Sequence, residues 1–597
     1  MAVRGGGRVL LSFWLIAFAA PFVAYVVTIC PSVYGLDSSE FTSAAWLLGI
    51  SHPPGHPLHA LLGKLASFVP LGDIALRLAL LSALLGALSS LALFATLSRF
   101  IRPVPSLALA LAFAASHAVW FQSIRAEVYT LHAALITAAL AAITRFPSSE
   151  KSRLAAAFLI GLALANHHYL TVVAIPGLAL IHAAVHGRVS LNAHKIVRSG
   201  AFVVLGLATY LYLPLRAGRV PEVDWGRPDT SSRFAWTVSA QLFQKSAERP
   251  RGSLAEGTTR ALEVVASDLH LVAAVAGFIA LALLIAARKA RLLGVALAIL
   301  FAGAIFPKAQ MGFLTSNPDD HGYLIVALAP LLIAIAAGLE FARDKFLNRL
   351  RASLQRNVVV AAALLVGALP VLVTLENFER NDGCDRRGAD TLARDQLRSI
   401  PEGTFLFSAY FKTEFAFAYL QGVERGRPDV TVVHRNALKL PGVLEDLATR
   451  PRAEVEMIGA VAKGLNARAE MTALAARRPF WWEIDFTMVG DDMKRLVPRG
   501  YFAEWMASPT SIDMRAAGLQ ERAFFLKRDA HLLAATGGDT EDIETIFWIH
   551  YLRGRFWATL GERIFSFAAF DRALAIDPNN GEVKAERAQV SGEPSQQ

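Results

Sequence analysis

Long apolar runs, separated by short polar connections, are the feature that most constrains how this chain of 597 residues can fold. A helix that crosses a bilayer needs about 20 mostly apolar residues. Runs of about this length or somewhat shorter lie near 9–29, 74–97, 104–121, 128–144, 154–166, 170–186, 199–215, 269–287, 292–306, 323–340 and 357–375. Only 18% of the residues are charged, whereas soluble domains usually have about 25%. The sequence therefore predicts an α-helical polytopic membrane protein with about eleven transmembrane helices.

Positive charge alternates along the connections between these runs. One set of connections contains Arg4/Arg8, Arg99/Arg102, Arg145/Lys151/Arg153, Arg188/Lys195/Arg198, Arg288/Lys289/Arg291 and Arg343/Lys345/Arg349/Arg351/Arg356. The short connections of the other set carry only Lys64, Arg125 and Lys308. Because lysine and arginine stay on the cytoplasmic side, this pattern predicts a cytoplasmic N-terminus, and an odd span count places the C-terminal part outside. The first run is nearer in length to a span than to a cleavable signal peptide, so we expect a retained helix.

The net charge of +10 comes from the same dispersed clusters. A nucleic-acid-binding protein would gather its basic residues in one patch or stripe. The charge is therefore a topology signal. We therefore expect the protein to interact with the lipid bilayer and not with a nucleic acid.

The unusual polar motifs all fall on the predicted outer side. They are Asp37-Ser-Ser-Glu40, Arg125-Ala-Glu-Val-Tyr129, Asn166-His-His-Tyr169, Pro214-Leu-Arg216, Trp225-Gly-Arg-Pro-Asp229 and Asn317-Pro-Asp-Asp-His-Gly-Tyr323. Convergence of such groups on one face is what an enzyme needs. A transporter more often places its polar groups near the bilayer midplane, in the broken helices of repeated halves. The pattern favours an enzyme with an extracytoplasmic active site.

Two carboxylates stand in the first outer connection. Asp37 and Glu40 share one face if residues 37–50 are helical. That helix would also have an apolar stripe suited to the membrane interface, formed by Phe41, Ala44, Ala45 and Leu48. Asp-x-x-Glu before an apolar run is also a capping-box pattern, in which Asp37 caps the helix and Glu40 reaches back. Both interpretations stay open, since a cap can leave one carboxylate oxygen available for chemistry.

The following segment, His52-Pro-Pro-Gly-His-Pro-Leu-His59, must turn tightly at its prolines and Gly55. Three histidines near two carboxylates could bind zinc or manganese. Their spacing matches no strong metal pattern, so we predict hydrogen-bonding roles for His52 and His56 and do not assign a metal site.

Beyond residue 376 the composition becomes that of a soluble domain. Residues 404–408, 429–433 and 480–484 read as strands and 413–423 as a helix, which predicts a small α/β domain over 376–540. Gly554, Trp557, Phe570, Ala573 and Pro578 follow the spacing of one tetratricopeptide repeat over 541–591. The tail, 592–597, is expected to be disordered. Residues 1–375 would then form the catalytic membrane module.

Cys30 and Cys384 are both predicted to lie outside, near the ends of the first and last spans. A disulfide between them is chemically permitted in an oxidising compartment. Two free thiols are the simpler expectation.

Several of these motifs resemble one known family. Asp37-Ser-Ser-Glu-Phe41, Leu48-Gly-Ile50 with His52-Pro-Pro-Gly55, Pro57-Leu58 and Glu127-Val-Tyr129 are similar to polytopic proteins of the transmembrane protein 260 type. The resemblance covers mainly residues 10–215, with weaker similarity at Trp225-Gly-Arg-Pro228 and Tyr419–Val430. That family is grouped with the GT-C glycosyltransferases and includes protein O-mannosyltransferases. The segment Ser408-Ala-Tyr-Phe-Lys-Thr-Glu414 departs from the polar, Asp-rich turn that such a domain would carry.

The resemblance implies an activity and a donor. GT-C enzymes use polyprenyl- or dolichyl-phosphate sugars, usually invert the anomeric centre, and place a catalytic acidic residue in the first outer loop, which here is Asp37 or Glu40. The acceptor would be a hydroxyl of a protein Ser/Thr or of a glycolipid. The resemblance therefore predicts a glycosyltransferase with no certain cofactor. Together with the apolar runs and the charge pattern, we expect a multi-pass protein of a bacterial inner membrane with a periplasmic active site.

The expected chemistry assigns a role to each polar motif. A hydroxyl is a weak nucleophile, so Asp37, our first choice for the base, would remove its proton while Glu40 orients the hydroxyl or shares this role. Arg125 and Arg216 are candidates for binding the leaving lipid phosphate. The remaining candidates for contacting substrate are His52, His56, Glu127, Tyr129, His167, His168 and His321. Two other functions compete: a transporter or flippase of lipid-linked sugars, and a membrane-anchored interaction protein that displays the repeat-like end.

Overall fold

The computed structural model describes residues 3–145, 149–187, 192–219, 221–248, 252–345, 352–448, 450–486, 491–508 and 513–591. The chain forms two compact units. The membrane unit comprises Met1–Cys30, Ile50–Gly218 and Phe234–Cys384, and the sheet unit comprises Pro31–Gly49, Arg219–Arg233 and Asp385–Gln597. The predicted boundary at 375 places the first outer connection in the membrane module, but the structure groups residues 31–49 with the sheet unit. The expected disordered tail, 592–597, lies outside the described residues.

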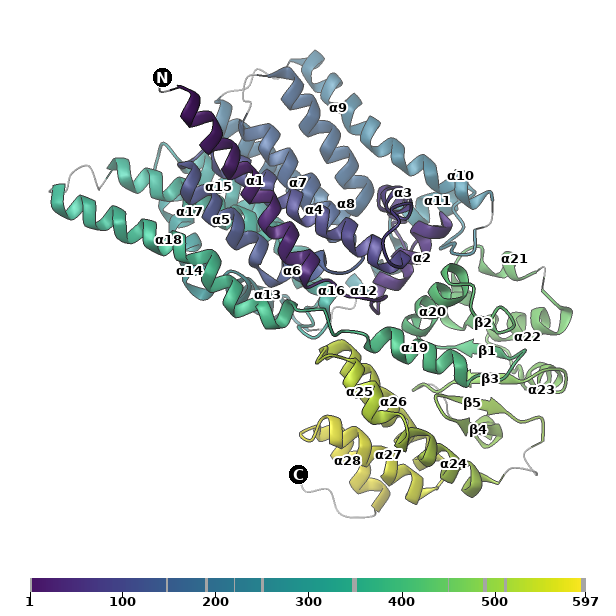
Figure 1. The fold of residues 1–597 in the computed structure, drawn as a ribbon. Helices are drawn as coiled ribbons and strands as arrows, with labels where there is room; N and C mark the ends of the chain where they lie inside the picture. Colours follow the sequence, from purple (N-terminus) through teal and green to yellow (C-terminus); the bar gives the residue numbers. More distant parts are fainter. Residues whose placement is uncertain are drawn as a thin grey trace. The chain divides into compact units, whose positions relative to one another are not determined.

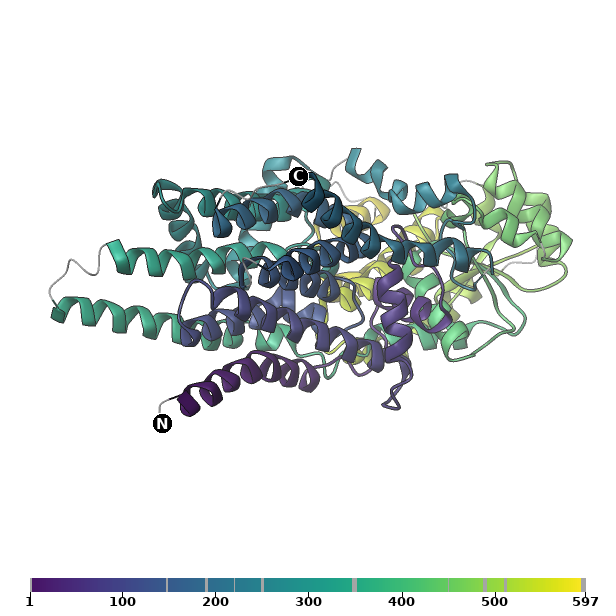
Figure 2. The same cartoon turned by 90° about the horizontal axis from the view of Figure 1, so that it is seen from above.

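Helices make up the membrane unit, where the apolar ones run side by side as a bundle (Figures 1 and 2). The first half contains α1 (Val3–Val27), α3 (Pro57–Ala66), α4 (Ile74–Leu97), α5 (Pro103–Ala115), α6 (His117–Ser123), α7 (Tyr129–Arg145), α8 (Glu150–His186), α9 (Ala193–Leu207), η1 (Ala208–Leu211) and α10 (Tyr212–Ala217). The second half contains α12 (Gln241–Glu248), α13 (Leu254–Asp268), α14 (Leu271–Ala286), α15 (Arg291–Met311), α16 (Pro318–Gly322), α17 (Ile325–Lys345) and α18 (Ala352–Asn381). A further helix, α11 (Ser231–Val238), begins in the sheet unit and ends in this one.

Length and apolarity identify six helices among the described residues that could cross a membrane, or up to eight if two bent pairs each count as one span. The bent pairs are α5 with α6, at 63°, and α13 with α14, at 113°. The apolar segments Leu11–Val27, within α1, and Tyr129–Thr144, within α7, are shorter than these helices and are not counted among them. A multi-pass membrane protein is therefore confirmed, whereas the predicted count of about eleven exceeds the number that these criteria give. The last span extends to Asn381 and not to residue 375.

The 37-residue α8 bends sharply at His167, whose φ of −149° and ψ of 83° are not helical. Close to this bend, the Asn166 side chain donates a 3.0 Å hydrogen bond to the carbonyl of Val128, just before α7 begins. At the far end of α8, the His186 ring lies 2.9 Å from the carbonyl of Ile143, near the end of α7. The second half of α8 therefore runs alongside α7.

The first half of α8 runs in the opposite direction. Arg153 donates a 2.8 Å hydrogen bond to the carbonyl of Lys195, nine residues after His186. A straight helix would separate Arg153 from His186 by about 50 Å, at 1.5 Å a residue. Nine further residues can span only about 30 Å. The two predicted runs, 154–166 and 170–186, are thus two antiparallel segments joined at the polar Asn166–Tyr169 motif.

Two glycines let the first half of α8 approach α9 closely. A Cβ atom on Gly161 would lie 2.2 Å from the Val203 carbonyl oxygen, and one on Gly206 would lie 2.7 Å from the carbonyl carbon of Gly161. Small residues at such positions allow the backbones of membrane helices to pack in direct contact.

The sheet unit contains a five-stranded sheet in the order β2-β1-β3-β5-β4. Its strands are β1 (Phe405–Ser408), β2 (Thr431–His434), β3 (Phe480–Glu483), β4 (Leu496–Arg499) and β5 (Phe502–Trp505). β1 is parallel to both β2 and β3, whereas β5 is antiparallel to β3 and to β4. The three strands expected from the sequence are confirmed. The hairpin of β4 and β5 was not predicted.

The helices of the sheet unit cover this sheet and extend beyond it (Figure 1). They are α2 (Asp37–Leu47), α19 (Gly388–Ser399), α20 (Phe411–Ala418), η3 (Tyr419–Val423), η4 (Asn436–Lys439), α21 (Val443–Leu447), α22 (Arg452–Ala462), α23 (Arg468–Ala475), η5 (Asp491–Arg495), α24 (Met514–Leu526), α25 (Asp529–Ala535), α26 (Thr540–Thr559), α27 (Arg563–Ile576) and α28 (Gly581–Ser591). The predicted helix at 413–423 corresponds to α20 and η3.

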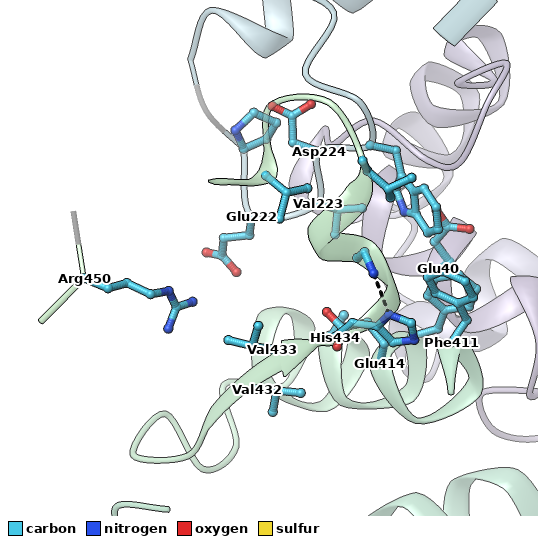
Figure 3. Close-up of a pocket in the computed structure, with 17 residues that line it drawn as sticks. Glu40, Glu222, Val223, Asp224, Phe411, Glu414, Val432, Val433, His434 and Arg450 are labelled. Atoms are coloured by element: carbon cyan, nitrogen blue, oxygen red, sulfur yellow. Dashed lines mark hydrogen bonds between the residues drawn. The ribbon is translucent and has the colours of Figure 1, made fainter. Parts of the chain in front are cut away.

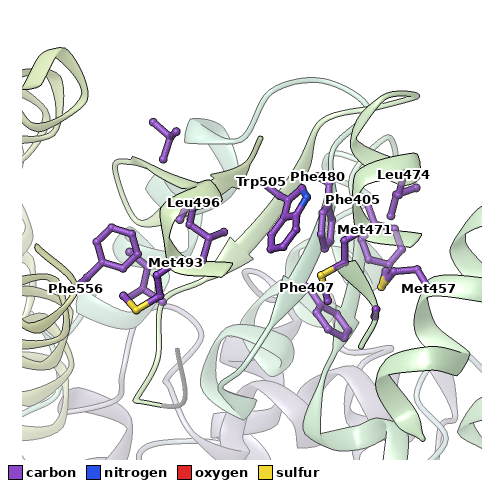
Figure 4. Close-up of a cluster of buried hydrophobic side chains, with 14 of the residues drawn as sticks. Phe405, Phe407, Met457, Met471, Leu474, Phe480, Met493, Leu496, Trp505 and Phe556 are labelled. Carbon is purple, nitrogen blue, oxygen red and sulfur yellow. The ribbon is translucent and has the colours of Figure 1, made fainter. Parts of the chain in front are cut away.

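One apolar core joins the sheet to these helices (Figure 4). Phe405, Phe407 and Phe480 are fully buried between the strands and α22 and α23, and Trp557 of α26 is buried in the same cluster. Gly554 lies against the ring of Phe570 in α27, where a Cβ atom would come within 2.4 Å of ring carbon. The repeat-like end is therefore a closely packed helix pair that shares its core with the sheet, as one repeat requires for burial of its apolar face.

Candidate active site

The two first-loop carboxylates lie on α2, in the sheet unit. Asp37 is the first helical residue and is partly exposed, and Glu40, one turn later, is 1% exposed. The residue at the N-cap position is Leu36, with a φ of 55°, and its apolar side chain makes no capping hydrogen bond. The capping-box interpretation is therefore wrong, because the helix begins at Asp37 and not after it.

The surroundings of α2 also differ from the expected membrane interface. Phe41, Ala44 and Ala45 are buried, and α2 packs against α20 and η3 of the sheet unit. The apolar stripe therefore packs α2, which carries the two carboxylates, against the α/β fold.

Glu40 lines a cavity of about 300 Å³ within the sheet unit (Figure 3). Its walls come from α2, from residues 221–225, from α20, and from the end of β2 with the segment that follows. Trp225 forms an aromatic wall, with its ring centroid 5.1 Å from that of Phe411 and 5.9 Å from that of Phe415. The His434 ring stacks on Phe411 at 4.0 Å.

Burial controls the charge state of the polar groups around this cavity. Burial raises the pKa of Glu414 from 4.5 to about 7, and the nearby Glu483 adds to that shift. Among the described residues, the carboxyl of Glu414 has one hydrogen-bond partner, the Ser408 hydroxyl, at a weak 3.4 Å. Burial also lowers the pKa of His434 to about 4. The His434 ring is neutral at pH 7, and its Nδ1 accepts from the Ala437 amide at 3.0 Å, so the proton is on Nε2.

Glu483 fixes the start of α20. Its carboxylate accepts from the amides of Ala409 and Tyr410, at 2.7 and 3.0 Å, and from the Thr413 hydroxyl at 2.5 Å. Burial raises the pKa of Glu483, while these three hydrogen bonds favour its ionised form. This network positions Glu414 one turn along α20, facing the cavity (Figure 3).

In the membrane unit, the Arg125–Tyr129 motif forms a buried ion-pair cluster. Arg125 is 1% exposed and lies 3.0 Å from Glu127 and 2.6 Å from Asp319. It also donates to Gln122 at 3.0 Å, and Gln122 donates to the Pro318 carbonyl at 2.7 Å. The loop before α7 is thus tied to the Asn317–Tyr323 motif, far away in the sequence.

Aromatic and imidazole rings gather around the bend in α8. The centroid of the His167 ring lies 5.9 Å from that of Tyr129, 5.2 Å from that of Tyr323 and 5.8 Å from that of His132. The His56 ring lies 6.4 Å from His167, and its Nδ1 is 2.7 Å from the Asn166 carbonyl. Since a carbonyl only accepts, His56 carries its proton on Nδ1 and a lone pair on Nε2. Burial lowers the pKa of His56 well below 6.5, so the ring is neutral at pH 7.

The other predicted residues lie at the edges of these clusters. His52 stacks edge-on against His56 at 5.3 Å. His321 packs against His117 at 5.0 Å, with its Nε2 3.1 Å from the Thr315 carbonyl. His168 is half-buried beside the bend in α8, and Arg216 is half-buried in α10, where it interacts with Tyr212.

Several polar residues of this region were not nominated from the sequence. Lys308 forms a 2.7 Å ion pair with Asp320 and lies 5.5 Å from the centroid of the Tyr323 ring. His132 is 1% exposed, and neither of its ring nitrogens has a hydrogen-bond partner among the described residues. The Asn317–Tyr323 motif did mark the neighbourhood of Asp319 and Tyr323. His132 lies inside an apolar run and gave no such signal.

Comparison with known proteins supports the family resemblance. Residues 37–189 match the sequence model of the family described as the Protein O-mannosyl-transferase TMEM260 N-terminal domain. The chain is 27% identical over 454 residues to the Protein O-mannosyl-transferase TMEM260 of Mus musculus, an alignment that covers 72% of this chain and 63% of the mouse protein. It is also 27% identical over 243 residues to the Protein O-mannosyl-transferase tmem260 of Dictyostelium discoideum, covering 37% of this chain and 29% of that protein. The predicted resemblance is confirmed, and the matches span less than two thirds of either relative.

Solved structures give a coarser likeness. ArnT from Cupriavidus metallidurans in the apo state aligns with a TM-score of 0.49 at 13% identity, covering 85% of this chain and 99% of that one. The archaeal oligosaccharyltransferase AglB from Archaeoglobus fulgidus, in complex with an inhibitory peptide and a dolichol-phosphate, aligns with a TM-score of 0.46 at 11% identity. That alignment covers 95% of this chain and 86% of AglB.

Proposed function

We propose that this protein is a membrane glycosyltransferase of the GT-C type, which moves a sugar from a polyprenyl-phosphate donor to a hydroxyl of a polypeptide Ser or Thr. The observation that carries the proposal is the extent of the family match. It begins at Asp37 and includes the carboxylates of α2, the Arg125–Glu127 pair and the bend at His167. The names of the two curated relatives support mannose as the sugar and a protein as the acceptor.

In this proposal Asp37 is the general base. It is the more exposed of the two first-loop carboxylates, so an acceptor hydroxyl can reach it, whereas Glu40 is buried. As Asp37 takes the proton, the hydroxyl oxygen would attack the anomeric carbon from the face opposite the lipid phosphate. The bond between that carbon and the phosphate oxygen would break, and the anomeric centre would be inverted. Glu40, held one turn away on the same helix, would orient the acceptor.

The departing lipid phosphate needs fixed donors. Arg125 is already bound by two carboxylates, so we assign it the role of holding Glu127 and Asp319 in place. We assign the imidazoles of His56 and His167 and the guanidinium of Arg216 to contact the phosphate, because their N–H groups can donate hydrogen bonds to its oxygens. We place this chemistry on the extracytoplasmic side, where the charge pattern of the connections puts these groups.

A donor panel tests the proposal. The purified full chain is incubated with polyprenyl-phosphate mannose, glucose or galactose and a Thr-containing peptide, and the peptide mass is measured. We expect one hexose on the hydroxyl, with mannose the preferred sugar, and, because we assign no resident metal, the same rate when a chelator is present. Failure to modify the peptide with every donor would contradict the proposal.

A further inference from the structure

The imidazole of His132 is a buried polar group inside the membrane unit. It lies one turn after Tyr129 on α7 and is 1% exposed. Neither of its ring nitrogens has a hydrogen-bond partner among the described residues. An unpaired charge would be costly at such a position, so the ring is neutral, with one N–H donor and one lone pair. Buried polar groups are normally paired, so this ring calls for an explanation.

Two further polar atoms beside His132 are in the same condition. The Nδ1 atom of His167 and the Oδ1 atom of Asn166 are buried, and neither has a hydrogen-bond partner among the described residues. The His167 ring centroid lies 5.8 Å from that of His132. The Asn166 side chain donates to the Val128 carbonyl at 3.0 Å, and the backbone amide of His132 donates to the same oxygen at 3.1 Å. The three groups therefore lie together where the bend in α8 packs against α7.

One water molecule can satisfy all three groups. It would accept a hydrogen bond from the N–H of His132 and donate to Nδ1 of His167 and to Oδ1 of Asn166. Buried waters make about three hydrogen bonds to polar groups that would otherwise be unpaired. The groups present, one donor and two acceptors, are the set that a single water can bind.

Such a bridge would determine the position of the proton on His167. A neutral imidazole carries one proton, and the hydrogen bond made by one ring nitrogen decides which nitrogen holds it. A water that donates to Nδ1 leaves the proton on Nε2, where it can be donated to a phosphate oxygen.

Other contacts hold the position of this ring but not its proton. The rings of Tyr129 and Tyr323 lie with their centroids 5.9 and 5.2 Å from that of His167. The Thr171 hydroxyl donates to the His167 carbonyl at 2.9 Å, which holds the backbone at the bend. The tautomer is therefore the property of His167 that the neighbouring imidazole can set.

We propose that His132 is a positioning residue for the sugar donor: through one buried water it holds His167 in the tautomer whose Nε2–H contacts the lipid phosphate. The inference rests on the proposed function for the assignment of His167 to that phosphate. An apolar side chain at position 132 would leave no ring nitrogen unpaired, and polar residues kept inside membrane segments usually have a function.

Binding of a lipid phosphate tests this inference without sugar transfer. Farnesyl phosphate is titrated into the purified full chain in detergent, and its Kd is measured by isothermal titration calorimetry. His132→Leu removes the N–H donor and should weaken binding about tenfold, the effect of one lost hydrogen bond to a charged group. His132→Gln and His132→Asn each keep an N–H donor, and the better of the two should bind within about threefold of the native protein. Native affinity in His132→Leu, or an equal loss in all three variants, would overturn the inference.

A double-mutant cycle separates positioning from a general loss of structure. If His132 acts through His167, His132→Leu should not weaken binding further in a His167→Leu background. Additive losses from the two changes would overturn the inference. The matched control is His182→Leu, which removes an imidazole from the second half of α8, where its ring centroid lies 4.3 Å from that of His186. This control should leave the Kd unchanged.

Thermal unfolding of each variant separates a positioning role from a structural one. His132→Leu removes an unpaired polar group, so its midpoint should be no lower than that of the native protein. A lower midpoint in His132→Leu, with the loss of binding following the loss of folded protein in all three variants, would assign His132 a purely structural role and overturn the inference.

A sugar-bearing donor distinguishes this role from direct contact with the sugar. The affinities for farnesyl-phosphate mannose and for farnesyl phosphate should fall by the same factor in His132→Leu. A loss confined to the mannose-bearing lipid would overturn the inference in favour of a sugar contact.

The same measurements separate the inference from the proposed function. Binding of farnesyl phosphate that depends on His132, without sugar transfer from any donor, would leave the inference standing and contradict the proposed activity. Sugar transfer by His132→Leu with an unchanged KM for the donor would do the reverse.

Discussion

Replacing Asp37 with asparagine is expected to lower the rate of sugar transfer by about 10²–10⁴-fold, the usual contribution of a positioned general base. Asparagine has nearly the same shape but cannot accept the acceptor's proton. Because Leu36 and not Asp37 occupies the N-cap position of α2, the helix should survive the change. The measurement is the rate of peptide modification at saturating donor, together with the thermal midpoint of the purified variant.

Two companion variants make this result specific. Glu40→Gln should reduce the rate less than Asp37→Asn if Glu40 only orients the acceptor. Glu456→Gln, an exposed change in the same unit, should leave the rate unchanged. An Asp37→Asn protein that keeps near-native turnover would reject Asp37 as the base, and a larger loss in Glu40→Gln would transfer that role to Glu40.

Replacing Arg125 with glutamine is expected to destabilise the protein by about 3–5 kcal/mol, the usual cost of leaving a buried charge without its partner. The change would leave Glu127, which is fully buried, and Asp319 facing each other without the guanidinium between them. Thermal unfolding in detergent, with native and variant proteins prepared identically, measures the loss.

Arg198 offers a matched comparison in the same unit. Its ion pair with Glu150 is only 2.6 Å long, but both side chains are about half exposed, at 43% and 52%. Such surface pairs contribute about 0–1 kcal/mol, so Arg198→Gln should be nearly neutral. Adding Glu127→Gln to Arg125→Gln should recover part of the lost stability. Equal midpoints for Arg125→Gln and Arg198→Gln would show that the buried cluster is not a structural centre.

Periodicity explains what the sequence could predict. Long apolar runs such as 74–97 and short apolar stretches such as 404–408 are set by local composition, and both formed the expected elements. Even the division of α8 was foreseen, because the polar Asn166–Tyr169 motif interrupts an apolar run. The polar motifs predicted to lie on the outer side also contribute to the two buried clusters of the membrane unit, through residues such as Arg125, Tyr129 and His167.

Long-range pairing explains what was missed. The contact between Arg125 and Asp319 joins residues 194 positions apart, and no local pattern encodes it. Likewise, nothing near Glu414 indicates that residues 221–225 form the opposite wall of its cavity. The capping interpretation of Asp37 was wrong for a different reason. The Asp-x-x-Glu spacing also suits a helix that begins at Asp37 itself, and in the structure Leu36, with its non-helical backbone, occupies the N-cap position.

The side of the membrane that holds α2 is the claim on which the proposed chemistry most depends. A single cysteine at position 37, with Cys30 and Cys384 changed to serine, can be tested in intact cells with a maleimide that does not cross membranes; a second variant carries its cysteine at Lys151, in a connection predicted to be cytoplasmic. We predict that position 37 is labelled in intact cells and position 151 only after permeabilisation. Labelling of position 37 only after permeabilisation would contradict the proposed extracytoplasmic sugar transfer.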